Sequence, residues 1–134
     1  MQSIIIIDDE IDVRDAIARV LTRAGYAVRG AATVLEALAE LERDPAEVVV
    51  TDIIMPTIDG VQAIQFIRKA FPLVRVIAIS GGGNFAAAYQ PTALTTTAYL
   101  AAAAEAGAHE VLTKPFEAQE LIKAIERVLG VGHA

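Results

Sequence analysis

The stretch "IIIIDDE" at residues 4–10 runs from four isoleucines straight into three acidic residues. A short β-branched run that does not alternate with polar residues is typical of a strand buried on both faces of a sheet. The runs "EVVVT" at 47–51 and "RVIAIS" at 75–80 have the same character. We therefore predict buried strands at 3–7, 47–51 and 75–80, and a polar end to the first of them.

Helical patterns lie between these strands. Apolar residues recur on one side of residues 11–24, and Gly25 marks the end of that helix. Thr33 and Glu36 form the T-x-x-E pattern of a capping box, which begins a second helix. The other expected elements are a weaker strand at 26–30, a helix from Asp59–Gly60 to Pro72, a helix at 97–107, a short strand at 110–113 and a helix from Glu117. This alternation predicts an α/β protein of the (βα)5 type, with a parallel sheet covered by helices on both faces.

Composition limits the classes of function. The 134 residues fit one domain, and 54% hydrophobic with 21% charged residues indicate a globular chain. The balance of 11 basic against 17 acidic residues gives a net charge of −6, which argues against nucleic-acid binding. Without cysteine there is no disulfide, thiol nucleophile or cysteine-type zinc site. No apolar run is as long as a membrane span, and "MQSIIII" lacks a signal peptide's basic leader, so we expect a cytoplasmic protein without membrane contact.

Polar side chains gather at the carboxyl ends of the predicted strands, where open α/β sheets bind their ligands. The second strand ends in Gly30 and Ala31 and is expected to contribute nothing. A lone acid at such a place is more often a helix cap, but polar residues on four strands favour a site. They are Asp8 and Asp9 after the first strand, Asp52 after the third, Ser80 at the end of the fourth, and Thr113 with Lys114 after the fifth.

These residue types suit phosphoryl transfer. Three carboxylates in one pocket repel each other and need either raised pKa values or a cation. Oxygen ligands without nearby histidine or cysteine favour Mg²⁺. Lys114 offers a point charge to a carboxylate or a phosphoryl oxygen, and Ser80 can donate one hydrogen bond to an anion. With a carboxylate as nucleophile, these parts predict a phosphoryl-transfer site.

Four motifs together resemble the receiver domain of two-component response regulators. They are "IIIIDDE", "VVVTDIIMPTIDG" at 48–60, "VIAIS" at 76–80 and "VLTKPF" at 111–116, and the resemblance covers essentially the whole chain. It implies a doubly wound, flavodoxin-like fold whose five parallel strands follow the order 2-1-3-4-5. Because the chain stops at "GVGHA", we expect a single receiver domain over 1–134 with no output domain.

The resemblance implies a magnesium site at the acidic residues. Asp9 and Asp52 would ligate Mg²⁺ directly, together with the backbone carbonyl of Ile54. Asp8 would act mostly through metal-bound water.

The resemblance also implies how the phosphoryl group is held. Asp52 would be the phosphoacceptor, Ser80 would bind the phosphoryl group after transfer, and Lys114 would bridge to its oxygens. Pro115 would follow a cis bond. The donor would be a phosphohistidine on a sensor histidine kinase or a histidine phosphotransfer protein, from which Asp52 attacks in line while Mg²⁺ and Lys114 neutralise charge.

Such a protein is not an enzyme with a separate substrate. It would catalyse only its own phosphorylation and autodephosphorylation, and it would signal by phosphorylation-dependent contact with a downstream protein that the sequence does not identify. We expect a monomer or a weak homodimer.

The chain departs from the usual receiver pattern in two features that concern the output signal. Val111 stands three residues before Lys114, where receivers usually carry Tyr or Phe, so the usual aromatic switch is absent. Tyr99 or Phe85 are possible substitutes. The spacing of 34 residues from Ser80 to Lys114 is longer than expected. We therefore place an insertion at about 84–96, between the strand at 75–80 and the helix at 97–107, either as a surface excursion or as a partner-specific element.

Two further hypotheses concern smaller features. Ile54 lies two residues beyond Asp52, and Gly82 lies two beyond Ser80, so no acid or amide is there to orient a water. This predicts slow to moderate autodephosphorylation. The histidines, His109 and His133, are expected to face solvent, and they lack metal-ligand spacing.

Three other functions compete with the receiver. A small phosphohydrolase with an Asp nucleophile usually has a second Asp two residues later, where this chain has Ile54. A dinucleotide site built on Gly81–Gly83 is disfavoured because its glycines should follow the first strand, which here ends in acids. A degenerate receiver that binds without phosphorylation is disfavoured by the complete set of site residues. The glycines fit a switch loop that lets backbone approach the phosphoryl group.

Overall fold

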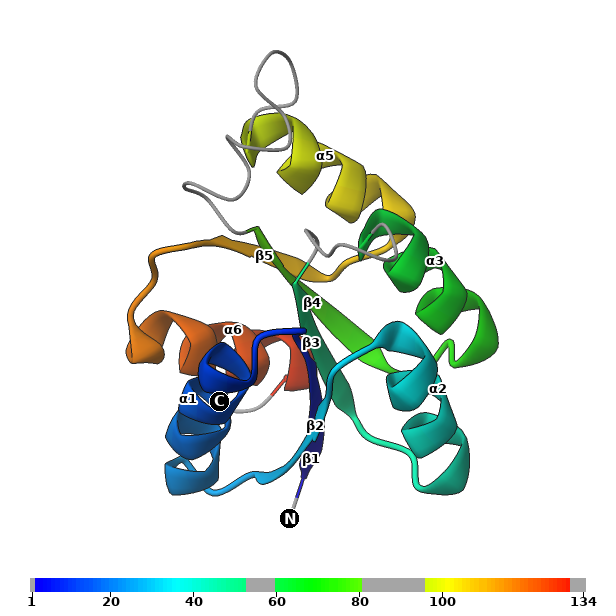
Figure 1. The fold of residues 1–134 in the computed structure, drawn as a ribbon. Coiled ribbons are helices and arrows are strands. Elements are labelled where there is room, and N and C mark those ends of the chain that lie inside the picture. Colours follow the sequence, from blue (N-terminus) through cyan, green and yellow to red (C-terminus); the bar gives the residue numbers. More distant parts are fainter. Residues whose placement is uncertain (1, 53–59, 81–95, 131–134) are drawn as a thin grey trace.

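The computed structural model describes residues 2–52, 60–80 and 96–130. In these ranges five helices alternate with five strands (Figure 1). The elements are β1 (Ser3–Ile7), α1 (Ile11–Arg23), β2 (Ala27–Ala31), α2 (Val34–Arg43), β3 (Val48–Asp52), α3 (Gly60–Ala70), β4 (Arg75–Ser80), α5 (Thr96–Ala106), β5 (Glu110–Thr113) and α6 (Ala118–Leu129).

The five strands form one parallel sheet in the order β2-β1-β3-β4-β5. The strand order implied by the family resemblance is therefore confirmed. The predicted strand boundaries hold to within one residue, with β2 and β3 each displaced by one residue toward the C-terminus. As a result Asp52 is the last residue of β3 and does not follow it.

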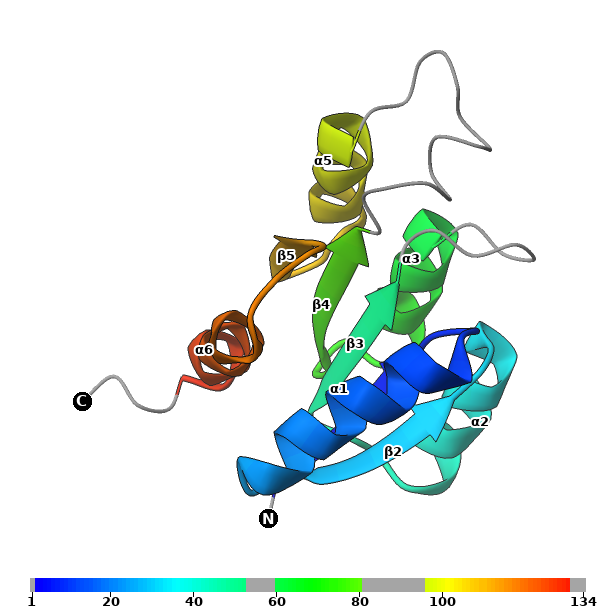
Figure 2. The same cartoon turned by 60° about the vertical axis from the view of Figure 1, so that its left-hand side comes forward.

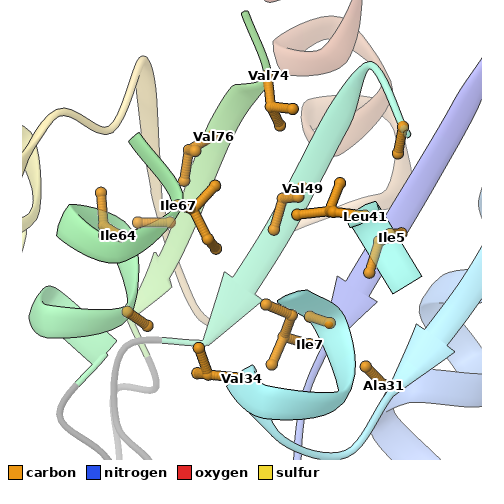
Figure 3. Close-up of a cluster of buried hydrophobic side chains, with 14 of the residues drawn as sticks. Ile5, Ile7, Ala31, Val34, Leu41, Val49, Ile64, Ile67, Val74 and Val76 are labelled. Carbon is orange, nitrogen blue, oxygen red and sulfur yellow. The ribbon is translucent and has the colours of Figure 1, made fainter. Parts of the chain in front are cut away.

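The sheet has a separate hydrophobic core on each face, because successive strand residues point to opposite sides. Ile5 and Ile7 face α2, α3 and α5, and Figure 3 shows their side chains among those of α2 and α3. Ile4 and Ile6 face α1 and α6 on the other side, as the arrangement of helices in Figures 1 and 2 shows. This double burial explains why "IIII" does not alternate with polar residues.

Burial of these isoleucines anchors the end of β1 that leads into the acidic residues. All four, Ile4 to Ile7, are at most 1% exposed. Fully burying one such side chain stabilises the fold by about 1.5–3 kcal/mol. Asp8 therefore leaves the sheet from a rigid strand, and its backbone position is set by the core.

The ends of the helices follow the predicted signals. The Glu36 N–H donates to Thr33 Oγ1 at 3.1 Å, and the Glu36 carboxylate accepts from the Thr33 N–H at 3.3 Å. This reciprocal pair is the predicted capping box of α2. Gly25 follows α1 with φ of 101°, a conformation that strains any residue with a Cβ atom, so the helix ends where predicted.

His109 corrects one prediction. Its ring is half-buried and does not face solvent, because Nδ1 accepts a 3.0 Å hydrogen bond from the Val76 N–H. The His109 N–H in turn donates to the Val76 carbonyl at 2.8 Å. The ring therefore supplies a hydrogen-bond acceptor that the start of β4 would otherwise lack, and it is held against the sheet.

Other predictions fall on parts of the chain outside the described residues. These parts include Ile54, Gly81–Gly83, Phe85 and His133, and most of the proposed insertion at 84–96, of which only Thr96 is described as the first residue of α5. In the ranges that the structure covers, none of the helices has the length and apolar character needed to cross a membrane.

Candidate functional site

The register of the sheet brings the predicted residues to one edge. Ile7 lies opposite both Ala31 and Thr51, and Ser80 lies opposite Thr113. The carboxyl ends of the strands are therefore level with each other. Asp8 is one residue beyond β1, Asp52 is the last residue of β3, and Lys114 is one residue beyond β5.

Lys114 joins carboxylates that come from two different strands. Its Nζ atom lies 3.4 Å from Oδ2 of Asp52 and 3.9 Å from Oδ2 of Asp8. Because β4 lies between β3 and β5, the lysine side chain spans the width of a strand to reach Asp52. The two carboxylate side chains are buried, and that of Lys114 is 27% exposed. One ammonium group thus faces two carboxylates in a partly closed site.

Burial dominates the electrostatics of Asp8. Loss of solvent raises the pKa of its carboxyl group to about 6. The negative charges of Asp52 and Asp9 act in the same direction, while the Glu10 N–H and the Lys114 ammonium oppose them. The Glu10 N–H donates to Asp8 Oδ1 at 2.9 Å, which fixes the orientation of the carboxylate. The acidic edge therefore holds more negative charge than Lys114 balances.

The remaining predicted residues lie after β1, at the end of β4, in α5, and in or just after β5. Asp9 is exposed beside Asp8. Ser80 ends β4 directly opposite Thr113, and Tyr99 lies in α5. Val111 lies in β5 opposite Ala78 and packs against the core beneath α2, α3 and α5. The Lys114–Pro115 peptide bond is cis, as the resemblance implied.

The site fits a hydrated divalent cation. Asp8 and Asp52 provide hard oxygen ligands in a buried setting, with Asp9 next to them on the solvent side. Among the residues that the structure describes, no three acidic or histidine side chains form a complete metal cage. Mg²⁺ commonly binds through one or two carboxylates and keeps several waters, so a full cage is not required. The unbalanced charge and the type of ligand atom therefore suit Mg²⁺.

An open hollow of about 540 Å³ lies beside the site, between α1 and the segment after β5. Its walls come from Asp12, Val13, Ala16 and Ile17 on one side and from Lys114, Pro115 and Phe116 on the other. The hollow is mainly apolar, with charged groups at Asp12 and Lys114. The hollow borders Lys114, whose Nζ atom lies 3.4 Å from Oδ2 of Asp52.

Arg14 also contacts the site, and the sequence did not predict this. Its Nη1 atom donates a 2.8 Å hydrogen bond to the backbone carbonyl of Asp8. The signal in the sequence is slight, since a single arginine one turn into a helix most often faces solvent. Gly30 on β2 is its neighbour, although the second strand was expected to contribute nothing.

Comparisons with known proteins agree on one family. The family model described as "Response regulator receiver domain" matches residues 4–126. The chain is 34% identical over 125 residues to the C4-dicarboxylate transport transcriptional regulatory protein DctD of Rhizobium meliloti (strain 1021), covering 93% of this chain but 25% of that protein. It is 30% identical over 126 residues to the chemotaxis protein CheY of Thermotoga maritima, covering 93% of this chain and 95% of that protein.

Solved structures give the same result. The crystal structure of the receiver domain of NtrX from Brucella abortus matches with a TM-score of 0.80 and 31% identity, over 96% of this chain and 99% of that one. This chain spans only about a quarter of the length of DctD and of the NtrC relatives that it also matches.

Proposed function

Since this chain belongs to the response regulator receiver domains, we propose that it accepts a phosphoryl group on Asp52 from a phosphohistidine in a Mg²⁺-dependent reaction. The main support is the 3.4 Å approach of the Lys114 Nζ atom to Asp52 Oδ2 at the buried edge of the sheet. That approach puts a cation beside one carboxylate, where a phosphoryl oxygen would develop charge.

In the transfer step an oxygen of the Asp52 carboxylate attacks the phosphorus atom. The P–N bond to the donor histidine breaks, its electron pair stays on the imidazole nitrogen, and an acyl phosphate forms on Asp52. Lys114 stabilises the equatorial oxygens through its charge, and Ser80 would donate a hydrogen bond to one of them. Rigid placement of Asp52 at the end of a buried strand limits the motion of the nucleophile.

The metal would be held by Asp9, Asp52 and the Ile54 carbonyl, with Asp8 acting through water. When bound, Mg²⁺ supplies positive charge to the phosphoryl oxygens that the carboxylates would otherwise repel. Asp8 keeps its side chain oriented by the Glu10 N–H and thereby presents one oxygen toward Lys114 and the site.

The donor would be a histidine kinase or a histidine phosphotransfer protein. The hollow between α1 and the Lys114–Phe116 segment supports this, because it borders Lys114 and offers an apolar wall to a protein surface. A donor seated there would bring its phosphohistidine to the carboxyl edge of the sheet. Output would pass to a downstream protein by a contact that depends on phosphorylation, in a cytoplasmic phosphorelay.

The chain would act on itself and not on a separate substrate. It would catalyse only its own phosphorylation and its own dephosphorylation, because the phosphoryl group would stay on its own Asp52 until water removes it. The acyl phosphate would then be lost to water.

Intact-mass measurement tests this function. The protein is incubated with MgCl2 and acetyl phosphate, alongside Asp52→Asn and the control Asp15→Asn, which alters an exposed carboxylate on α1. One added phosphoryl group on the wild type and on the control, and none on Asp52→Asn or in EDTA, is expected. Unmodified wild-type protein, or turnover of many phosphoesters per chain, would overturn the proposal.

A further inference from the structure

The backbone carbonyl of Asp8 lies where the β1–β2 ladder ends. The Asp8 N–H still donates to the Ala31 carbonyl at 3.1 Å, as in a parallel ladder. If the ladder continued, the carbonyl of Asp8 would accept from the amide of residue 33. That amide, of Thr33, instead donates to the Glu36 carboxylate of the α2 capping box at 3.3 Å. The capping box therefore removes the strand donor that the Asp8 carbonyl would use.

Arg14 supplies the missing donor. It lies one turn into α1, which packs along the β2 side of the sheet (Figure 2). Its Nη1 atom donates to the Asp8 carbonyl at 2.8 Å, a short distance for a hydrogen bond from a charged donor. Both backbone groups of Asp8 are therefore satisfied, one by β2 and the other by α1.

Gly30 leaves the space that this arrangement needs. The stem of Arg14 crosses β2 at Gly30, where an added Cβ atom would lie 2.9 Å from Cδ and 3.1 Å from Nε of Arg14. Real Cβ atoms essentially never make contacts of 2.9 Å, so Arg14 would have to move. Glycine in a strand weakens that strand, and the close approach of the Arg14 side chain explains why glycine occurs at position 30.

We propose that Arg14 is a positioning residue for the acidic loop, whose guanidinium replaces the missing strand amide at the Asp8 carbonyl while Gly30 accommodates its stem. This inference rests on the proposed function, since the loop that Arg14 fixes carries Asp8 and Asp9. Without Arg14 the half-buried carbonyl loses its donor, and the loop relaxes to find another. The two carboxylates then lose their alignment with Asp52.

A purely electrostatic role and a positioning role of Arg14 predict opposite changes in Mg²⁺ affinity when Arg14 is removed. Arg14 is a cation beside an acidic site, so removing it favours cation binding if only electrostatics matter. If Arg14 positions the loop, removing it weakens Mg²⁺ binding, by about tenfold for a residue that orients metal ligands. The sign of the change therefore identifies the role.

The first experiment measures the Mg²⁺ dissociation constant by isothermal titration calorimetry. Arg14→Ala and Arg14→Met, which keeps an apolar stem without a donor, should both bind about tenfold more weakly. Arg14→Lys should recover much of the affinity, because it keeps one charged donor. Arg19→Ala removes an exposed charge from the same helix and should bind like the wild type.

A double-mutant cycle tests the role of Gly30. Gly30→Ala keeps every charge but displaces Arg14, so it should weaken Mg²⁺ binding in the wild type. In the Arg14→Ala background it should have no further effect, because the side chain that it displaces is gone. Additive effects of the two changes would contradict the proposal, as would unchanged or tighter binding in Arg14→Ala.

Amide hydrogen exchange tests the positioning role of Arg14 without depending on Mg²⁺ binding. The Asp8 and Glu10 amides should exchange faster in Arg14→Ala than in the wild type, and Arg14→Lys should slow them again, while the Ile6 amide should not change. If the wild type binds no Mg²⁺ and is not phosphorylated, the proposed function fails but this measurement still decides the role of Arg14. Equal exchange at Asp8 and Glu10 in all variants would overturn it.

Discussion

The Nζ atom of Lys114 lies 3.4 Å from Oδ2 of Asp52, although the two residues come from strands that are separated by β4. The same atom lies 3.9 Å from Oδ2 of Asp8. One side chain that follows the edge strand β5 thus neutralises part of the charge of two carboxylates at the ends of the central strands β1 and β3.

Removing this ammonium group should slow phosphorylation while the fold is kept. We expect Lys114→Met to lower the rate of phosphorylation by acetyl phosphate about 10²–10³-fold at saturating Mg²⁺, the cost of losing one stabilising group in a charged transition state. A time course of intact mass gives the rate. Lys123→Met, an exposed lysine on α6, should react like the wild type. An unchanged rate in Lys114→Met would rule out its proposed role.

Asp8→Asn should stabilise the metal-free protein at neutral pH. Burial raises the pKa of Asp8 from 3.8 to about 6, so the folded state holds this proton to higher pH than the unfolded chain does. The stability that this provides is fully present below pH 3.8 and is lost as pH rises through 6. Ionising Asp8 in the folded state then costs about 3 kcal/mol at pH 7.

Urea denaturation in EDTA at pH 4 and pH 7 measures this difference. The advantage of Asp8→Asn over the wild type should be largest at pH 7 and small at pH 4, and MgCl2 should reduce it at pH 7. Asp15→Asn, at an exposed position, serves as the control. A variant less stable than the wild type at pH 7 would contradict the electrostatic assignment.

His109 should make stability fall in mild acid. Burial lowers its pKa below 6.5, and the nearby charges of Arg68 and Arg75 act in the same direction. Its contribution is therefore present above pH 6.5 and is lost as pH falls through the lower pKa of the folded state. Protonation of Nδ1 would also break the hydrogen bond from the Val76 N–H.

His109→Asn keeps an acceptor near Nδ1 but does not titrate. Between pH 7.5 and 5.5 its free energy of unfolding should fall less than that of the wild type, whereas His109→Ala should lose about 1–3 kcal/mol at pH 7.5 by leaving the Val76 N–H unpaired. Urea denaturation at the two pH values gives both numbers. Parallel pH profiles for the wild type and His109→Asn would exclude the assignment.

Ile54 should set the lifetime of the acyl phosphate. An apolar side chain two residues beyond Asp52 cannot orient an attacking water, so Ile54→Asn and Ile54→Glu should both hydrolyse faster than the wild type. The decay of phosphorylated mass after removal of the donor gives the rate. Equal lifetimes in all three proteins would count against this hypothesis.

The parts of the site that could be predicted are those that strand ends determine. Once "IIII" and "VVV" are identified as buried strands, Asp8 and Asp52 must leave the sheet at the same edge, and Lys114 follows β5 to that edge by the same rule. The capping box of Thr33 and Glu36 could also be predicted, because its two residues lie three positions apart in the sequence. The strand order came from the family resemblance.

Arg14 and His109 could not be predicted for a physical reason. The helical pattern places Arg14 on α1 but says nothing about a carbonyl left without its strand partner, which depends on where β2 ends and α2 begins. Likewise His109 precedes a strand, and only the pairing of β4 with β5 brings its ring to the Val76 N–H. Both contacts arise from tertiary structure and leave no periodic signal.

Chemical trapping of the modified residue tests Asp52 as the phosphoacceptor most directly. Borohydride reduces an aspartyl phosphate to homoserine, and peptide mass spectrometry then locates the new residue. After incubation with Mg²⁺ and a phosphohistidine donor protein, we predict homoserine at position 52 only. Homoserine at position 8 or 9, or phosphorylation that survives in Asp52→Asn, would contradict the assignment.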